Sequence, residues 1–183
     1  DGWYGGDGAY SIRLDDRRTL LAIGDVSGKG AGAAMIMANV QASLRALSGV
    51  DIDLARAVGR LNDVIRGNTE LGQFITFFAC IYDAAAGRLE YVNAGHNPPR
   101  IVRGTGETLL LETGGPILGI LPAVRYGLGS IDLAPGDLLV AFTDGVTEAC
   151  NTADEEVGEA RVGELVAGAR RQRTTMPSPA MVQ

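Results

Sequence analysis

The order of apolar and polar positions in the first third of the chain predicts a β-hairpin followed by two helices. Residues 9–14 and 19–23 are short β-rich runs joined by a polar turn. Residues 31–47 continue without a breaker and predict a helix. A second helix is expected over residues 52–66, where apolar side chains recur at intervals of three and four and form one stripe. We expect these helices to pack as one layer on a sheet.

Strands dominate the following part of the chain. The run 124–133 is interrupted by two glycines, which predicts a bulged strand or a strand at a sheet edge. Residues 138–143 are apolar throughout and predict a strand that is buried on both faces. The chain then becomes polar, and a last amphipathic helix is expected over residues 157–171. The other predicted strands are 73–82, 88–93, 100–103 and 108–111.

Asp25 lies where the first apolar strand gives way to a glycine-rich turn. A phosphate-binding P-loop needs four residues between its glycines and a Ser or Thr after the lysine, and Gly24 to Gly30 has neither feature. Two interpretations stay open for this stretch alone. Asp25 could cap the following helix, or it could bind a metal ion that the glycines allow to approach the backbone.

Two further acids stand at comparable positions. Asp7 precedes the first strand of the hairpin and Asp25 follows the second, so the two acids are expected to be neighbours in space. Carboxylates held close together repel each other unless a cation lies between them or one of them is protonated. Asp144 repeats the pattern of Asp25, because it follows an apolar strand and precedes a glycine.

Composition limits the classes of function. A chain of 183 residues with 46% hydrophobic and 21% charged residues is typical of a single soluble globular domain. The net charge of −6 argues against nucleic acid as a partner, and no apolar run is long enough to insert into a membrane. Two separated cysteines and one histidine do not make a zinc site, so we expect Cys80 and Cys150 to be reduced thiols in a cytoplasmic protein.

The acids themselves favour one kind of chemistry. Oxygen-only ligands favour Mg²⁺ or Mn²⁺ over zinc or copper, and two such ions about 3.5–4 Å apart can promote hydrolysis of a phosphate ester. Glycoside hydrolysis also uses paired carboxylates, but its sugar clefts are rich in aromatic residues and this chain has only 5%. A serine triad could use His96, but the chain has no Gly-x-Ser-x-Gly elbow to hold the nucleophile.

Five motifs, in order from residue 5 to about residue 165, resemble one known family. The chain is similar to the bacterial PP2C-type serine/threonine phosphatases of the RsbU/SpoIIE family. The motifs are Gly5-Gly-Asp7, Gly24-Asp-Val-Ser-Gly-Lys-Gly30, Asn93-Ala-Gly-His-Asn-Pro-Pro99, Gly115-Pro-Ile-Leu-Gly119, and Pro135-Gly-Asp137 with Phe142-Thr-Asp-Gly-Val-Thr-Glu148.

The resemblance implies an α+β fold, a PP2C-like α-β-β-α sandwich of two antiparallel sheets flanked by helices. It implies a centre of two Mn²⁺ or Mg²⁺ ions held by Asp7, Asp25 and Asp144 and by the backbone carbonyl of Val26. It also implies removal of phosphate from a phosphorylated STAS-type anti-sigma-factor antagonist, in a partner-switching pathway that regulates a sigma factor. Upstream sensor domains or an activator, and a homodimer, are compatible with the family.

Two departures from the family pattern matter. Eukaryotic PP2C enzymes carry a histidine as general acid two residues after the aspartate that matches Asp25, and here that position is Ser27. The family also ends in a strand with a last metal-binding aspartate, whereas this chain stops at Gln183. We therefore expect a single domain over residues 1–183 that lacks its last strand and the start of its first. The alternative is a catalytically deficient PP2C-like regulatory or interaction module with an incomplete metal centre.

Overall fold

The computed structural model describes residues 7–28, 31–47, 53–68, 73–147 and 158. By its contacts the chain divides into two compact units, Asp1–Thr143 and Asp144–Gln183. The first unit contains both sheets and the two long helices. Of the second unit the structure describes the short helix α3 (Asp144–Thr147) and Gly158. The predicted helix over residues 157–171 therefore lies, apart from Gly158, outside the described residues.

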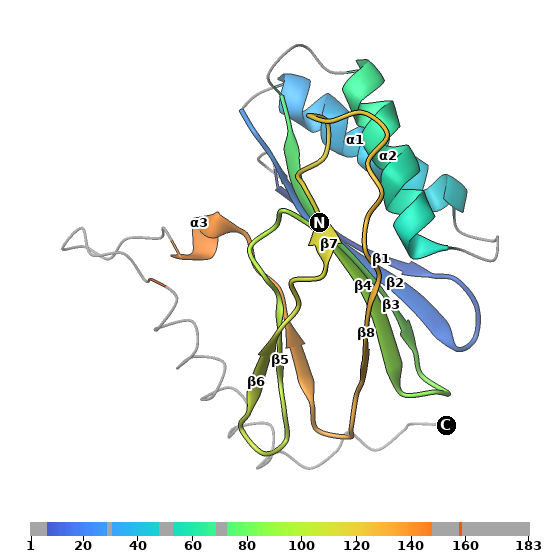
Figure 1. Cartoon of the computed structure of the whole chain (residues 1–183), viewed down its shortest axis with the longest axis vertical. Helices are drawn as coiled ribbons and strands as arrows, with labels where there is room; N and C mark the ends of the chain where they lie inside the picture. Colours follow the sequence, from blue (N-terminus) through green and yellow to red (C-terminus); the bar gives the residue numbers. More distant parts are fainter. Residues whose placement is uncertain (1–6, 29–30, 48–52, 69–72, 148–157, 159–183) are drawn as a thin grey trace, which may run out of the picture. The chain divides into compact units, whose positions relative to one another are not determined.

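The first sheet is built on an antiparallel meander of four strands (Figure 1). Its order is β1-β2-β3-β4, and two short strands lie along the outer edge of β4. The parallel strand β7 pairs at Asn93 and Ala94, and the antiparallel strand β8 pairs at the other end of β4. The strands are β1 (Asp7–Arg13), β2 (Arg18–Val26), β3 (Ile75–Asp83), β4 (Arg88–Ala94), β7 (Gly114–Gly115) and β8 (Gly129–Asp132).

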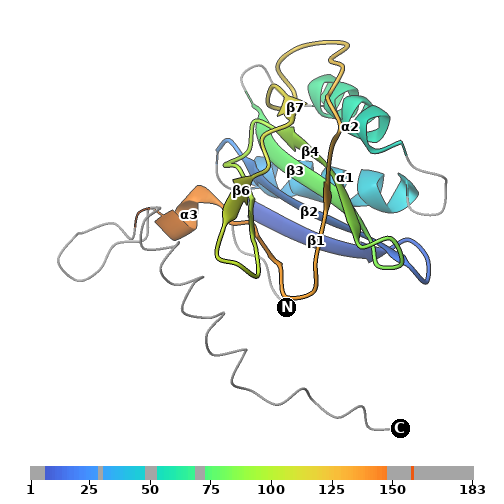
Figure 2. The ribbon, with the colours of Figure 1, turned by 60° about the horizontal axis from the view of Figure 1, so that its bottom comes forward.

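Helices α1 (Ala31–Leu47) and α2 (Leu54–Asn68) cover one face of this sheet (Figure 2). The predicted apolar stripe of α2 is the side that it buries, and each of its four residues is at most 3% exposed. Burial of a large aliphatic side chain contributes about 1.5–3 kcal/mol, so this layer supplies a large part of the stability of the fold. The stripe consists of Leu54, Val58, Leu61 and Ile65.

The opposite face of the first sheet packs against a second, three-stranded sheet. Its order is β6-β5-β9, all antiparallel, and its strands are β5 (Arg100–Val102), β6 (Thr108–Leu110) and β9 (Leu138–Val140). A second apolar cluster lies between the sheets and includes Phe78, Tyr91 and Ile101. The described part of the chain thus has an α-β-β order of layers, and the predicted α+β class is confirmed.

Three details differ from the sequence-based predictions. The apolar run 138–143 was expected to be buried on both faces, but β9 covers only Leu138–Val140 and these residues are half-buried at the end of the described sheet order. The strand predicted over 124–133 is shorter, and it lies at a sheet edge as expected. The pair Gly114–Gly115 lies in none of the predicted strands and forms β7. Among the described helices none is both long and apolar enough to span a bilayer.

Candidate metal centre

One end of the first sheet brings together two of the three predicted acids and the loop that contains His96. Strands β1 and β3 begin at this end and strands β2 and β4 finish there, because neighbouring strands of the meander run in opposite directions. We call this end the rim, and define it by Asp7, Asp25, Val26, Thr76 and His96. The five residues come from β1, β2, β3 and the loop that follows β4.

The register of the hairpin places Asp7 directly opposite Asp25, as the sequence predicted. The alternation of backbone groups shows which kind of pair they form. The Ser27 N–H donates to the Phe74 carbonyl at 2.9 Å, so the backbone groups of Ser27 point toward β3, and those of Asp25, two residues earlier, do so as well. Asp7 and Asp25 are therefore a non-hydrogen-bonded pair, the type in which Cα atoms are about 4.5 Å apart.

The backbone of Val26 points the other way. Ile75 of β3 lies opposite Val26. Both backbone hydrogen bonds of Ile75 are made with Leu118, on the side of β3 that faces away from β2. The carbonyl of Val26 consequently points away from β3 and toward the side of Asp7, while its side chain is buried in the helix-side core. Val26 can thus offer its carbonyl oxygen without exposing its side chain.

Ser27 fixes the end of this strand. Its hydroxyl oxygen accepts a hydrogen bond from the Phe74 N–H at 2.8 Å, in the place of the ladder bond that would continue the sheet. The hydroxyl therefore holds β2 and the approach to β3 together at the rim.

Asp25 lies on the face of the sheet that is turned toward the second sheet, since Leu20, Ala22 and Val26 occupy the helix side of β2. Asp25 is half-buried there. Its neighbour on the other side is Thr76 of β3, which is in direct register with it. The Thr76 Oγ1 lies 3.0 Å from the Nδ1 of His96.

The loop that contains His96 is held by the side chain of Asn93, at the end of β4. The Asn93 carboxamide accepts a hydrogen bond from the His96 N–H at 2.8 Å and donates to the His96 carbonyl at 3.0 Å. The same amide group donates to the carbonyl of Leu111 at 3.0 Å, which ties the loop to the segment after β6. His96 is 4% exposed. The backbone on both sides of the His96 ring is thus fixed by one asparagine side chain.

The third predicted acid, Asp144, opens α3 and belongs to the second unit of the chain. Its meeting with Asp7 and Asp25 therefore stays a prediction. Among the described residues no group of three or more His, Cys, Asp or Glu side chains is close enough to hold a metal. The side chain of Asp7 lies outside what the structure describes, so the described donors are those of Asp25 and Val26.

These donors fit a hard divalent cation. Carboxylate and backbone carbonyl oxygens are the ligands that Mg²⁺ and Mn²⁺ prefer, and the strand register sets Asp25 beside Asp7. The strand register pairs Asp25 with an aspartate and a threonine, so its two cross-strand neighbours carry no sulfur or imidazole donor. The chemistry of the donor set therefore agrees with the metal that the sequence predicted.

Sequence reasoning missed the parts played by Thr76 and Asn93. Thr76 lies inside a predicted strand, and its position opposite Asp25 depends on a pairing across 51 residues of chain. Asn93 did carry a signal, because a polar residue at the end of an apolar strand needs hydrogen-bond partners when it is buried. Asn62 gave the same signal in α2 and is fully buried, where it accepts from the Gly119 N–H and donates to the Leu121 carbonyl.

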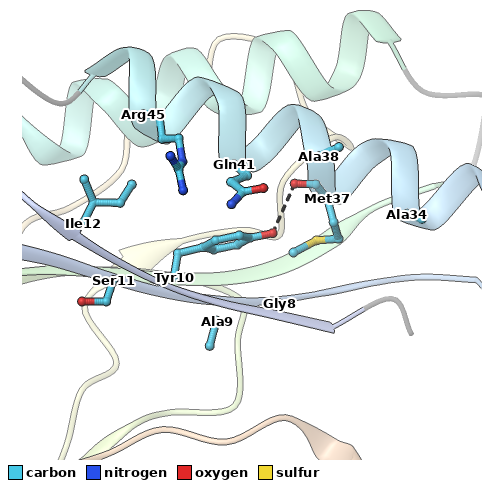
Figure 3. A pocket seen from close by; sticks show the side chains of 10 residues that line it. All are labelled: Gly8, Ala9, Tyr10, Ser11, Ile12, Ala34, Met37, Ala38, Gln41 and Arg45. Carbon is cyan, nitrogen blue, oxygen red and sulfur yellow. Dashed lines mark hydrogen bonds between the residues drawn. The ribbon is translucent and has the colours of Figure 1, made fainter. Parts of the chain in front are cut away.

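A cavity of about 320 Å³ lies between β1 and α1 (Figure 3). The Tyr10 hydroxyl crosses it and donates to the carbonyl of Met37 at 3.2 Å, and Gln41 and Arg45 reach into it from α1. The cavity is on the helix side of the sheet, whereas Asp25 is on the opposite face. It is therefore separate from the rim, although Gly8 in its lining follows Asp7 in the chain.

The layers and strand order described above are those of PP2C-type domains. A family model described as stage II sporulation protein E (SpoIIE) matches residues 15–182, nearly the whole chain. The chain therefore belongs to the SpoIIE family of bacterial PP2C-type domains, which includes RsbU.

Two relatives and one solved structure show the extent of the similarity. Protein IcfG of Synechocystis sp. is 31% identical over 188 residues, which cover 88% of this chain and 30% of IcfG. Phosphoserine phosphatase RsbU of Bacillus subtilis is 33% identical over 147 residues, which cover 79% of this chain and 44% of RsbU. The RsbU and RsbW domains of Rv1364c from Mycobacterium tuberculosis align with a TM-score of 0.78 and 25% identity, over 94% of this chain and 48% of that one. The chain thus spans less than half the length of these proteins.

A more distant structure has the same fold and contains metal. The catalytic domain of the serine/threonine protein phosphatase PstP, in complex with two manganese ions, aligns with a TM-score of 0.59 and 21% identity. The alignment covers 91% of this chain and 85% of the PstP chain. At this level of identity the similarity shows the fold.

Proposed function

We propose that this chain is a metal-dependent protein serine/threonine phosphatase domain that uses Mn²⁺ or Mg²⁺. The observation that carries the proposal is the register of the hairpin, which sets Asp7 opposite Asp25 in the close type of antiparallel pair. Two adjacent carboxylates at a half-buried strand end repel each other, and a divalent cation between them removes that cost. The chemistry that such ions supply when bound is polarisation of a phosphate ester and acidification of water.

The residues of the chain would share the work as follows. Asp7, Asp25 and the carbonyl of Val26 would hold one or both ions, and Asp144 would complete the set from the start of α3. Ser27 would keep the end of β2 in place through its hydrogen bond with the Phe74 N–H. Because that bond ties the end of β2 to the approach to β3, we assign Ser27 to support of the site.

The substrate that we propose is a phosphorylated STAS-type anti-sigma-factor antagonist in a partner-switching pathway. The family supports this choice, and one relative, RsbU, is a phosphoserine phosphatase by name. Sensor domains or an activator would act on the phosphatase domain from elsewhere in the whole protein, which we propose to work in the cytoplasm. A homodimer is a further part of this proposal.

The proposal is tested by Mn²⁺-dependent hydrolysis of p-nitrophenyl phosphate and of a phosphorylated STAS protein. Asp25→Ala should lower turnover at least about 100-fold without unfolding the chain, because Asp25 is half-buried at a strand end and contributes little to the core. Asp16→Ala is the matched control, since that carboxylate is 98% exposed in the hairpin turn. Equal turnover of Asp25→Ala and the unchanged chain would refute the site.

The same assay separates the enzyme from the catalytically deficient module. The chain and a form extended at its C-terminal end are compared at saturating Mn²⁺. Activity that appears only with the extension shows that further residues complete the centre. If neither form hydrolyses either substrate while both bind the phosphorylated STAS protein, the chain is an interaction module and the proposal is wrong.

A further inference from the structure

The contact between Thr76 and His96 lies beside Asp25 and has no part in the proposed function. His96 is the only histidine of the chain and is 4% exposed. Burial of a polar ring is costly unless its nitrogens find partners, and one of them lies 3.0 Å from the Thr76 hydroxyl. Thr76 in turn is the cross-strand neighbour of Asp25.

The strand geometry brings the threonine hydroxyl to the acid. Asp25 and Thr76 are directly opposite in an antiparallel pair, and such residues have Cβ atoms about 4.5–5.5 Å apart on the same face of the sheet. Ile75 and Phe77, the residues on either side of Thr76, are both in the helix-side core. Thr76 therefore points to the opposite face of the sheet, where it contacts His96. A hydroxyl oxygen carries one proton and two lone pairs, so Thr76 can accept from one neighbour and donate to another.

The direction of the contact decides what Thr76 can do. If the neutral ring carries its proton on Nδ1, the ring donates to Thr76 Oγ1 and leaves the hydroxyl proton available for a carboxylate. If Nδ1 carries no proton, the Thr76 hydroxyl must donate to the ring instead and has no proton left for the carboxylate. Asn93 holds the His96 backbone through both the N–H and the carbonyl, and the 4% exposure of His96 leaves its ring little room for another rotamer.

We propose that Thr76 and His96 are positioning residues for the metal-binding carboxylate of Asp25. The His96 Nδ1–H donates to the Thr76 hydroxyl, and the Thr76 O–H donates to Asp25. This inference rests on the proposed function, because it assumes that Asp25 is a metal ligand. Hydrogen bonds to ligating carboxylates orient them, and loss of such outer partners typically lowers metal affinity about 10–100-fold.

The contact could instead serve only to tie the loop after β4 to β3. In that case removal of the hydroxyl would lower the stability of the fold and leave the affinity for metal unchanged. The two roles are separated by a measurement of Mn²⁺ binding on folded protein, and not by activity alone.

The experiment compares Thr76→Val with the unchanged chain. Valine keeps the branched shape and suits a strand, so the variant should fold, as far-UV circular dichroism would verify. The dissociation constant for Mn²⁺, measured by titration calorimetry without substrate, should rise about 10–100-fold. Thr76→Ser should stay within about threefold of the unchanged chain. Thr108→Val is the matched control, since Thr108 is exposed on β6, away from the rim.

His96 is tested by two substitutions. His96→Asn retains an N–H donor at a position close to that of Nδ1 and should keep Mn²⁺ affinity within about threefold, whereas His96→Leu should weaken it as Thr76→Val does. At saturating Mn²⁺ the KM for p-nitrophenyl phosphate should be unchanged in all of these variants. If Thr76→Val does not fold, Thr76→Ala should show the same loss of affinity, and wild-type affinity in it would refute the inference.

The outcomes distinguish this inference from the proposed function. If Asp25→Ala binds Mn²⁺ as well as the unchanged chain does, the metal site itself is wrong and both fail. If Asp25→Ala loses Mn²⁺ binding while Thr76→Val and His96→Leu retain it, only the positioning role is refuted. Loss of affinity in Asp25→Ala, Thr76→Val and His96→Leu, with Thr76→Ser and Thr108→Val unaffected, supports it.

Discussion

Asn93 is the residue whose removal should disturb the rim most severely without touching a proposed ligand. It is 4% exposed at the end of β4 and its side chain makes three hydrogen bonds to backbone groups. Asn93→Ala would take a partner away from the His96 N–H and from the carbonyls of His96 and Leu111. None of these groups would gain a partner from the alanine side chain.

The size of the effect follows from these three bonds. Loss of its hydrogen-bond partner lowers stability by about 1–3 kcal/mol for each buried polar group. Carbonyl groups lie at the lower end of this range because they have a second lone pair. The three losses share one loop and are not independent, so we expect the free energy of unfolding to fall by about 3–5 kcal/mol. Since domains are stable by only about 5–15 kcal/mol, this is a large fraction of the total.

The assay is urea unfolding followed by far-UV circular dichroism, together with thermal unfolding. For a chain of this size the expected loss corresponds to a decrease in Tm of about 6–20 °C. Asn97→Ala is the matched control, because Asn97 is a half-buried asparagine of the same loop for which the described structure shows no side-chain hydrogen bond. A loss below about 1 kcal/mol for Asn93→Ala, or one equal to that of Asn97→Ala, would show that these bonds do not stabilise the fold as reasoned here.

Two further predictions concern groups whose pKa the fold shifts. Burial in the core between the sheets raises the pKa of the Cys80 thiol to about 12. In a Cys150→Ser background the native chain should therefore not react with iodoacetamide at pH 8, while the urea-unfolded chain should react fully. Rapid reaction of the native chain would contradict the burial of Cys80. The pKa of Asp137 is lowered by hydrogen bonds from the Ala134 N–H, the Arg103 guanidinium and the Gly104 N–H. Its stabilising effect is therefore present above the ordinary aspartate pKa of about 4 and is lost as the pH falls through the lower folded value. Asp137→Asn should be less stable than the unchanged chain at pH 7 and should approach it at about pH 2, as measured by urea unfolding at each pH; a constant difference would contradict the linkage.

The sequence predicted the local parts of the rim well because they depend on neighbouring residues. The hairpin of β1 and β2 is joined by a short polar turn, and a short turn fixes the register of its strands. The pairing of Asp7 with Asp25 could therefore be read directly from the spacing. The helix over residues 31–47 was predicted with the bounds that the structure shows, because its apolar run is continuous.

Other parts could not be read in this way because they depend on pairings between distant segments. The register of β3 against β2 is set across two helices, so nothing near Thr76 in the sequence indicates that it faces Asp25. Strand β7 has no side-chain pattern, since it consists of two glycines. A Cβ at Gly114 would clash with the Asn93 carbonyl oxygen, so only glycine allows this approach, and the sequence does not indicate which backbone comes near.

The face of the sheet that carries Asp25 changes from apolar to polar along its length, and this change bears on the proposed cation site. Three successive cross-strand pairs of β2 and β3 share the face: Leu21 with Cys80, Ile23 with Phe78, and Asp25 with Thr76. The first two pairs belong to the apolar core between the sheets. Asp25 is thus a carboxylate at the edge of a low-dielectric layer, where electrostatic interactions are stronger than in water and an uncompensated second carboxylate is more costly. The same layer that makes the pairing of Asp7 with Asp25 unfavourable in the absence of metal would strengthen the attraction of both for a divalent ion. A rim of equal acidity on a fully solvated sheet would bind such an ion more weakly, because water would screen the attraction and the repulsion alike.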